Sequence, residues 1–479
     1  MTTSHSVVKR IAFEEWRALL RDRAAVFGLA LLTVLMLVAS LSAWEQQRHA
    51  SAERARYQGA VDAQFKAQPD RHPHRMVHYG QFVFRPLNPL AAFDPGIDGF
   101  TGNTLFLEGH RQNSANFGDV RQTSLLLRFG ALTPAFVLQV LAPLLLVFFG
   151  HAAVARERES GTLRILLAQG VASRQVVLGK LIALSGFAGL MLLPALLGLA
   201  LLAASSAALW TSAGMLAAGY CAWLLLWSLA VVLVSLLCTR GRDALLVLLA
   251  AWAVVVILLP RWIPDLANQA VAVPTRFENG IHVQREYIAL GDAHNPDDPK
   301  FKAYREGLLK QYGVTRVEDL PVNFKGLVGM EGERKSSSLF NRYAADTFAR
   351  QARQNAIVDG FGWLAPTLAL RRLSMAASGT DLVNFRSFTE QGERYRYSLV
   401  QGLNRLQAEQ VAYADDTTPG KENRVSHDHW QAFPAFHFEE APLADTVARI
   451  APAAVILLAW LLSLSALTWL LGGRLGRIA

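Results

Sequence analysis

The sequence predicts an all-α membrane protein with six transmembrane helices, an N-terminal amphipathic helix and two large regions outside the membrane. Hydrophobic residues make up 52% of the 479 residues, and charged residues make up only 18%. The hydrophobic residues are concentrated in long runs, and about 20 apolar residues in a helix suffice to cross a bilayer core. Asp, Glu and Lys are absent from the interior of these runs, where an unpaired charge would cost several kcal/mol.

Six runs qualify as spans, and they cover residues 24–44, 132–151, 181–205, 212–238, 244–262 and 447–472. The alternative, buried helices of a soluble core, is disfavoured because such helices rarely stay apolar on all faces beyond about 14 residues. The first run could also be a cleaved signal peptide. Its length exceeds the roughly 7–15 apolar residues of a signal core, and a charged stretch precedes it, so we predict that it remains as an anchor.

Residues 1–23 are predicted to form an amphipathic helix that lies in the plane of the membrane surface. Val8, Ile11, Trp16 and Leu19 recur at helical spacing, with charged residues between them. A partly ordered tail is the alternative. An in-plane helix at this position would lead directly into the first span.

Two large regions lie between the spans. In the first, 45–131, the polar segment 45–68 favours a continuation of the first span. The residues after it, up to His110, are rich in Pro, Gly and aromatic side chains that indicate turns and short strands. The second region, 263–446, is predicted to be a mainly helical domain, because its apolar residues repeat at helical spacing.

The distribution of charge predicts how the chain is oriented. With the N-terminus in the cytoplasm, residues 1–23, 152–180, 239–243 and 473–479 lie on the cytoplasmic side. They hold 14 basic and 6 acidic residues, and so carry +8 of the net charge of +9. This is the positive-inside pattern, and it accounts for the pI of 9.7 without nucleic acid as a partner. We therefore expect cytoplasmic N- and C-termini and periplasmic outer regions.

The two cysteines, Cys221 and Cys238, both fall in the fourth predicted span. The large outer regions contain no cysteine, so no disulfide framework stabilises them. We expect these regions to be held together by their own packing.

The connection between the second and third spans, 152–180, is the segment to which the sequence assigns the function. Residues 160–162 (Ser-Gly-Thr) form a helix-entry signal, and leucines follow at i, i+3 and i+4 spacing. Gly170 would end this helix, and Ser173 would cap the next one. We predict a short helix held between two spans, with one face for a soluble motor protein. The alternative is a plain amphipathic connector on the lipid surface.

This segment resembles the signature cytoplasmic loop of type-2 ABC transporter permeases. The resemblance rests on Glu157, Glu159, Gly161, Thr162, Leu163, Leu166, Leu167, Arg174, Gly179 and Lys180. In that family an amphipathic entry helix precedes six spans, and the first cytoplasmic loop forms a coupling helix that docks on the ATPase. The resemblance implies that these residues, apart from Arg174 and Gly179, couple the chain to an ATPase. Family members often have Pro where Gly170 stands.

By resemblance, such a permease works with two cytoplasmic ABC ATPase subunits and with a second permease, either an identical chain or a sister chain. The chain itself lacks the G-x-x-x-x-G-K-[ST] loop that cradles phosphates, since Leu181 follows Gly179 and Lys180. We therefore expect no enzymatic activity and no cofactor on this chain. ATP and Mg²⁺ would be bound by the partner ATPase, and membrane lipid would surround the spans.

A second resemblance lies later in the chain, in residues 373–381, 393–396 and 402–404 together with Phe385 and Phe388. These residues are similar to those of a permease subfamily that carries a large extracytoplasmic domain of unknown function. Together the two resemblances cover nearly the whole chain. The second one implies an architecture for the outer domain but no activity.

Histidines in the outer regions are the candidates for metal binding. His72, His74 and His78 in the first region, and His427 and His429 in the second, have spacings that could chelate copper, zinc or nickel. No cysteine and no well-placed third ligand accompanies them. We therefore predict no metal site and expect solvated or core imidazoles. No G-x-S-x-G or H-E-x-x-H pattern indicates an enzyme in either region.

The sequence thus predicts a permease subunit that moves an unidentified substrate across the bacterial cytoplasmic membrane by alternating access, driven by a separate ATPase. Export is favoured by the resemblance. The alternative is a membrane-anchored binding or scaffold protein whose outer domain engages a partner in the cell envelope, with an ATPase serving mechanical signalling. The large outer regions motivate this alternative, and the 152–180 segment favours the permease.

Overall fold

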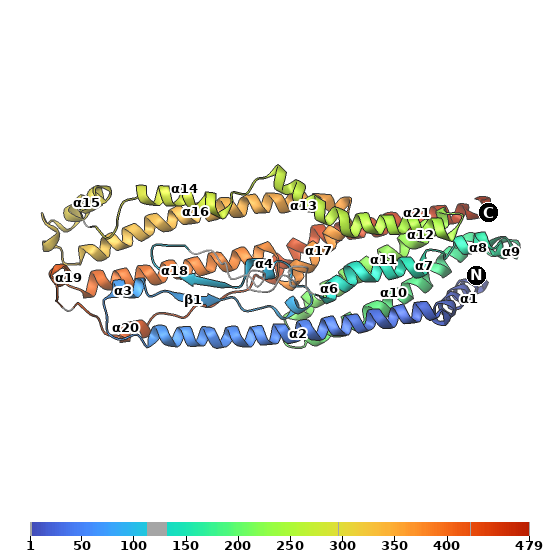
Figure 1. Ribbon diagram of the computed structural model, residues 1–479, viewed down its shortest axis with the longest axis horizontal. Coiled ribbons are helices and arrows are strands. Elements are labelled where there is room, and N and C mark those ends of the chain that lie inside the picture. The colour runs from blue at the N-terminus through green and yellow to red at the C-terminus, as the bar shows by residue number, and fades with distance from the viewer. Residues whose placement is uncertain (1, 113–131, 296, 422, 479) are drawn as a thin grey trace.

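A computed structural model of the chain describes residues 2–112, 132–295, 297–421 and 423–478. The molecule is elongated, with a bundle of long helices at one end and a mainly helical domain at the other (Figure 1). Both termini lie at the bundle end. The part of the predicted first outer region from 113 to 131 falls outside the described residues.

Within the described residues, the bundle contains six helices that are long and apolar enough to cross a membrane. The prediction of an all-α membrane protein with six transmembrane helices is confirmed. In chain order the spans are α2 (Arg23–Lys66); α6 (Pro134–Phe136), η3 (Val137–Leu141) and α7 (Ala142–Gly150); α10 (Ser173–Ala203); α11 (Leu209–Leu237); α12 (Gly241–Trp252), η4 (Ala253–Leu258) and α13 (Leu259–Ala270); and α21 (Leu443–Ile478).

A separate helix, α1 (Thr2–Arg21), precedes the first span and packs against α10. Two glycines of α10 permit this close approach. A Cβ atom on Gly179 would lie 2.6 Å from Ile11, and one on Gly186 would lie 2.9 Å from Trp16. Side chains at these two positions would therefore push α1 away from the bundle.

The first span continues far beyond the membrane. α2 has 44 residues, which corresponds to about 66 Å, roughly twice the thickness of a bilayer core. Its sequence becomes polar from Glu45 onwards, and Phe65 near its end belongs to a core of the outer domain. One unbroken helix therefore connects the bundle to the outer domain (Figure 1).

Two spans are interrupted by π-helical segments, η3 and η4. Side chains of neighbouring helices donate hydrogen bonds to carbonyl groups in these segments. Trp223 Nε1 donates to Leu138 O at 3.2 Å, and Trp252 Nε1 donates to Val140 O at 3.0 Å. Thr367 donates at 2.9 Å to a carbonyl of η4. Because unsatisfied carbonyls are costly inside a membrane, these donors stabilise the interruptions.

The outer domain is mainly helical, as predicted. Its longest helices, α16 (Phe324–Gly360) and α18 (Leu382–Gln410), pack against each other, and α14 (Arg276–Ala289) lies along α16. The shorter elements are α3 (Pro73–Val77), β1 (Gln81–Phe84), η1 (Pro89–Ala92), α4 (Asp98–Thr101), β2 (Thr104–Leu107), η5 (Pro299–Phe301), α15 (Lys302–Tyr312), η6 (Val317–Asp319), η7 (Phe361–Trp363), α17 (Pro366–Ser378), α19 (Tyr413–Thr417) and α20 (Asp428–Gln431).

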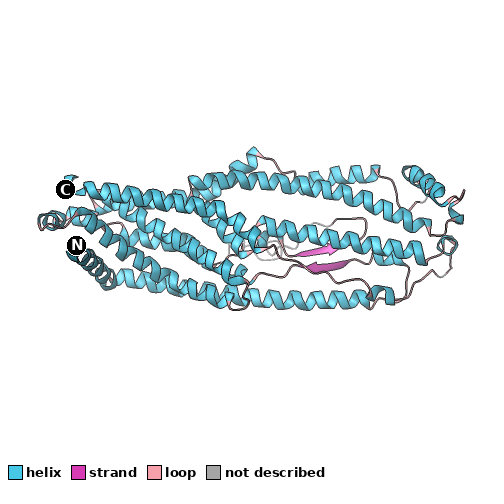
Figure 2. Ribbon diagram, turned by 180° about the vertical axis from the view of Figure 1, so that it is seen from behind, coloured by secondary structure: helices cyan, strands magenta, loops and turns pink. Residues whose placement is uncertain are grey.

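The short strands expected in the first outer region form one antiparallel pair, β1 and β2, with Phe82 opposite Phe106. Figure 2 shows the pair between α2 and α18. Val83 and Leu105 point into a core that they share with Phe388 of α18. The two outer regions are therefore packed into one domain, although they are far apart in the sequence.

Helix α17 joins this domain to the bundle. Its residues Leu370 and Leu373 are buried in the same core as the spans. Gly219 of α11 permits the contact, because a Cβ atom there would lie 2.8 Å from Leu373. The outer domain is thus attached to the bundle by α17 and by the continuous helix α2.

A buried ion network holds α16 to α18. The guanidinium of Arg396 lies 2.7 Å from Glu333 and 2.7 Å from Glu393, and it donates to Ser337 Oγ at 2.7 Å. Burial alone would raise the pKa of Glu333. The hydrogen bond from His110 and the charge of Arg396 outweigh burial and lower the pKa of Glu333 to about 2.

The low pKa of Glu333 predicts that the outer domain loses stability in acid. Its folded-state pKa lies below the ordinary value of 4.5, so the ionised network stabilises the fold above that pH. This contribution is lost as the pH falls from 4.5 toward 2. Glu333→Gln is expected to reduce stability near neutral pH by about 3 kcal/mol and to weaken the pH dependence.

Thermal unfolding of the full chain at a series of pH values measures both effects. Glu390→Gln is the matched control, because Glu390 forms an exposed ion pair with Arg386 and its loss should cost less than about 1 kcal/mol. A Glu333→Gln variant as stable as this control would show that the network does not stabilise the domain.

Candidate functional site

The 152–180 connection forms two short helices, α8 (Ala155–Glu159) and α9 (Thr162–Ala168), at the end of the bundle where both termini lie (Figure 1). Gly161 joins them with φ of 78°, in the left-handed region that favours glycine. Gly170, which follows α9, has φ of 84°. Two glycines thus determine where α9 begins and where it ends.

Lys180 of α10 connects the helices of this site. It is 4% exposed, and its Nζ atom lies 2.7 Å from Glu15 Oε2 of α1 and 2.7 Å from Glu157 Oε1 of α8. Through its other oxygen, Glu157 accepts a hydrogen bond from Thr162 of α9. Since a buried charge without a partner costs several kcal/mol, one cation fixes the relative positions of α1, α8, α9 and α10.

Glu15 is the member of this cluster that the sequence pattern does not identify. It lies on α1, far from the 152–180 segment in the sequence, and reaches Lys180 only because α1 packs on α10. Of the predicted coupling residues, the structure brings Glu157, Thr162 and Lys180 into direct contact.

Two further charged residues of α8, Arg158 and Glu159, bind the connection between α11 and α12. Glu159 Oε2 accepts a hydrogen bond from Gly241 N at 3.2 Å, at the N-terminus of α12. Arg158 donates to the carbonyls of Cys238 and Leu236 at 3.0 and 3.1 Å, at the C-terminal end of α11. α8 is therefore attached to the fourth and fifth spans as well as to the third.

The leucine face of α9, which the sequence predicts to be available to a partner, is covered by the bundle, and a different face is exposed to solvent. Leu163 is 0% exposed, and Leu166 and Leu167 are half-buried against the bundle core. Ile165 is 58% exposed. The three leucines thus attach α9 to its own chain, and Ile165 is the large apolar residue of α9 that a partner can reach. The i, i+3, i+4 spacing predicts an apolar stripe but not what covers it.

A polar depression lies beside α8 and α9 at the same end of the bundle. It is lined by Arg158, Glu159, Leu163, Arg164, Thr239, Arg240 and Arg242. Four of these seven residues are arginines and one is acidic, so the depression is positively charged. An acidic surface on a soluble partner would be complementary to it.

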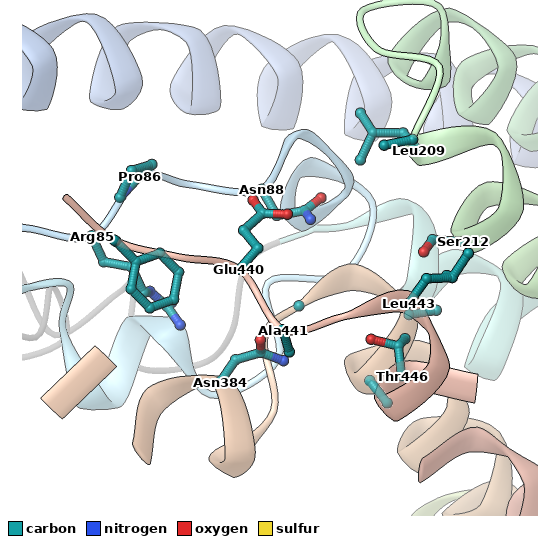
Figure 3. Close-up of a pocket in the computed structure, with 15 residues that line it drawn as sticks. Arg85, Pro86, Asn88, Leu209, Ser212, Asn384, Glu440, Ala441, Leu443 and Thr446 are labelled. Carbon is teal, nitrogen blue, oxygen red and sulfur yellow. The ribbon is translucent and has the colours of Figure 1, made fainter. Parts of the chain in front are cut away.

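A second pocket lies at the opposite end of the bundle, where α11 and α21 meet the outer domain (Figure 3). Its volume is about 150 Å³, below the roughly 300 Å³ of the smallest typical ligand pockets. Ser212, Asn384 and Glu440 contribute polar groups to its lining. We therefore interpret this pocket as a packing gap between the bundle and the outer domain, and not as a substrate site.

The structure separates the predicted histidine candidates. His72 caps α3, and its Nε2 atom lies 3.2 Å from Asp416. His427 Nδ1 lies 2.9 Å from Asp70, and His429 belongs to α20. These three histidines do not meet at a common point.

His74 and His78 instead approach two histidines that the sequence pattern does not single out, His110 and His294. The four side chains offer ring nitrogens that lie within 4.8 Å of one another. Burial and the neighbouring imidazoles lower the pKa of His74 to about 3 and also lower the pKa of His78. His74 and His78 are therefore neutral at physiological pH.

Two family models match the chain. The one described as "ABC-2 family transporter protein" matches residues 10–300, and the one described as "Domain of unknown function (DUF3526)" matches residues 276–439. The first match includes most of α1, the first five spans and α8–α9, and the second covers the outer domain from α14 to α20. Both resemblances drawn from the sequence are confirmed. No curated protein and no solved structure matches the chain.

The position of Lys180 predicts the effect of removing its charge. Lys180→Met should lower the stability of the detergent-solubilised protein by about 3 kcal/mol, because Glu15 and Glu157 would lose their buried cation. Lys9→Met removes an exposed lysine of α1 and should change stability by less than about 0.5 kcal/mol. Thermal unfolding compares the two variants. Equal midpoints would show that Lys180 is not the anchor of this site.

Proposed function

This chain belongs to the ABC-2 family of transporter proteins, and we propose that it couples ATP hydrolysis on a separate subunit to the movement of a substrate across the bacterial cytoplasmic membrane. Its family and its six apolar spans make it the membrane-spanning subunit of a transporter. The observation that carries the coupling proposal is the attachment of α8 and α9 to the third, fourth and fifth spans and to α1. A short solvent-facing helix with such attachments can pass a displacement to the bundle.

The contacts define a route for this displacement. An ATPase that pushes on the exposed side of α9, around Ile165, would move Glu157 through its hydrogen bond with Thr162. Glu157 would then move α10 and α1 through Lys180. Glu159 would move the α11–α12 connection at the same time. A buried ion pair resists separation, so these helices are expected to move together.

The proposed arrangement in the membrane follows from charge. The positively charged depression and both termini lie at the α8–α9 end, which the positive-inside rule assigns to the cytoplasm. The outer domain would then lie in the periplasm. Two ATPase subunits, which bind ATP and Mg²⁺, and a second permease, identical or sister, would complete the transporter. Alternating access, with export as the direction, is the transport cycle we propose.

The exposure of Ile165 predicts a variant that uncouples the transporter without unfolding it. Ile165→Asp should leave the bundle intact, because this side chain is 58% exposed, and should lower permease-stimulated ATPase activity by at least about tenfold. Ile288→Asp is the matched control, since Ile288 is 67% exposed on α14 in the outer domain. ATPase activity of the reconstituted complex is the measurement. Wild-type coupling in Ile165→Asp would contradict the assignment of α9.

A second function, mechanical signalling to a partner in the cell envelope, is favoured by one observation. α2 is a single helix from the first span to the outer domain, so motion of the bundle would reach the domain directly. Purification of the tagged chain in mild detergent, with mass spectrometry of its partners, separates the two functions. We expect an ABC ATPase in near-equal amount. Envelope proteins without an ATPase would favour the scaffold function.

A further inference from the structure

Four histidines converge in the outer domain at helix α3, which lies in the part of this domain away from the bundle (Figure 1). His74 lies in α3 and His78 caps the C-terminus of this helix. His110 follows β2, and His294 lies in the connection between α14 and η5. We propose that these four side chains bind one late first-row divalent metal ion, with zinc matching the geometry. The proposal does not depend on the transport function.

The four rings are arranged around a common point. The six distances between their centroids range from 4.8 Å, between His74 and His78, to 5.8 Å, between His74 and His110 and between His78 and His294. Four points with nearly equal mutual distances form a tetrahedron. The longest of these distances is about 1.2 times the shortest, whereas the diagonals of a square would be about 1.4 times its sides. Tetrahedral coordination is the usual geometry of zinc.

One pair of ring nitrogens already has the spacing of neighbouring metal ligands, and the four nitrogens lie within 4.8 Å of one another. Zinc–nitrogen bonds of about 2.0–2.1 Å place neighbouring ligand atoms of a tetrahedron about 3.3 Å apart. The Nε2 atoms of His74 and His78 are 3.2 Å apart. A set of imidazoles without thiolates or carboxylates selects zinc, copper or nickel over magnesium and calcium, which prefer oxygen.

Two of the histidines are oriented by carboxylates, as metal-bound histidines usually are. His110 Nδ1 lies 3.3 Å from Glu333 Oε2, and His294 Nδ1 lies 3.1 Å from Asp292 Oδ1. A carboxylate that accepts the N–H of one ring nitrogen leaves the lone pair of the other for a metal and raises its basicity. The buried Arg396 in turn holds Glu333.

His110 shows the strongest signs of a ligand. Its Nε2 atom is buried and has no hydrogen-bond partner, which is costly for a polar atom unless something else binds it. Its backbone has φ of 60°, and among the described residues it is the one non-glycine residue with positive φ. Such a conformation persists where the surroundings enforce it, and it is common at functional sites. Here the backbone N–H of His110 donates to Glu333 at 3.1 Å.

A metal-free histidine cluster is the alternative. One hydrogen bond links His74 to His78, but it leaves the buried Nε2 atom of His110 unsatisfied. A single cation would satisfy the ring nitrogens of all four residues at once. The site is also accessible, because the His294 side chain is 48% exposed. An ion can therefore enter from solvent without unfolding the domain.

Zinc titration of the full-length protein tests the proposal. The chain is purified in detergent through a tag without histidine, stripped with a chelator, and titrated with Zn²⁺ in a calorimeter. One ion per chain with micromolar or tighter affinity is expected. Co²⁺ bound at the same site should show the intense visible absorption of tetrahedral coordination. No binding at micromolar Zn²⁺, or the weak spectrum of octahedral Co²⁺, would overturn the proposal.

Variants assign the ligands. His294→Ala changes an exposed loop residue, so folding is preserved, and it should weaken binding more than Asp292→Asn does. Asp292→Asn removes an orienting carboxylate and should weaken binding by about 10–100-fold. His427→Ala is the matched control, since His427 is an exposed histidine of the same domain that pairs with Asp70. Binding lost equally in His294→Ala and His427→Ala, or kept in both, would contradict the four-histidine site.

Discussion

The burial of charge is the constraint on which both ends of this molecule depend. Lys180 in the bundle is 4% exposed and Arg396 in the outer domain is 1% exposed, and each is bound by two carboxylates. Removing either cation would leave two carboxylates without this buried counterion, so the helices that supply these groups are held together. The same carboxylates position functional groups. Glu157 binds α9 through Thr162, and Glu333 orients His110.

The two ends are joined by elements that do not bend easily. α2 crosses the junction as one helix, and α17 packs its leucines into the bundle core. The interrupted spans lie next to this junction: α17 supplies Thr367, which bonds a carbonyl of η4, and Trp252 bonds a carbonyl of η3. π-helical turns inside α-helices occur frequently at functional sites. A change in the spans would therefore reach the outer domain through α17 as well as through α2.

The fold was more predictable from sequence than the sites, and the reason is the range of the interactions. Six spans and a helical domain follow from the length and period of apolar residues, which are local properties. The partners Glu15 and His294 approach their sites through packing between distant segments, which no local spacing encodes. Helix α9 shows the limit of what the sequence can predict. Its apolar stripe is visible in the sequence, but only the tertiary structure shows that Leu163 is covered and Ile165 is not.

A metal ion bound by the four histidines would stabilise the attachment of α14 and the connection that follows it. α14 has no buried residue, so it rests on α16 through surface contacts such as the stacking of Tyr287 on Phe340 and the pairing of Glu286 with Arg342. A surface ion pair such as Glu286–Arg342 contributes little stability. The connection that follows α14 carries His294, and the outer domain has no cysteine with which to tie it down. Coordination to His294 would attach this peripheral segment to α3 and, through His110 and Glu333, to the buried network of Arg396. A bound ion would thus anchor a segment that packing holds only at the protein surface.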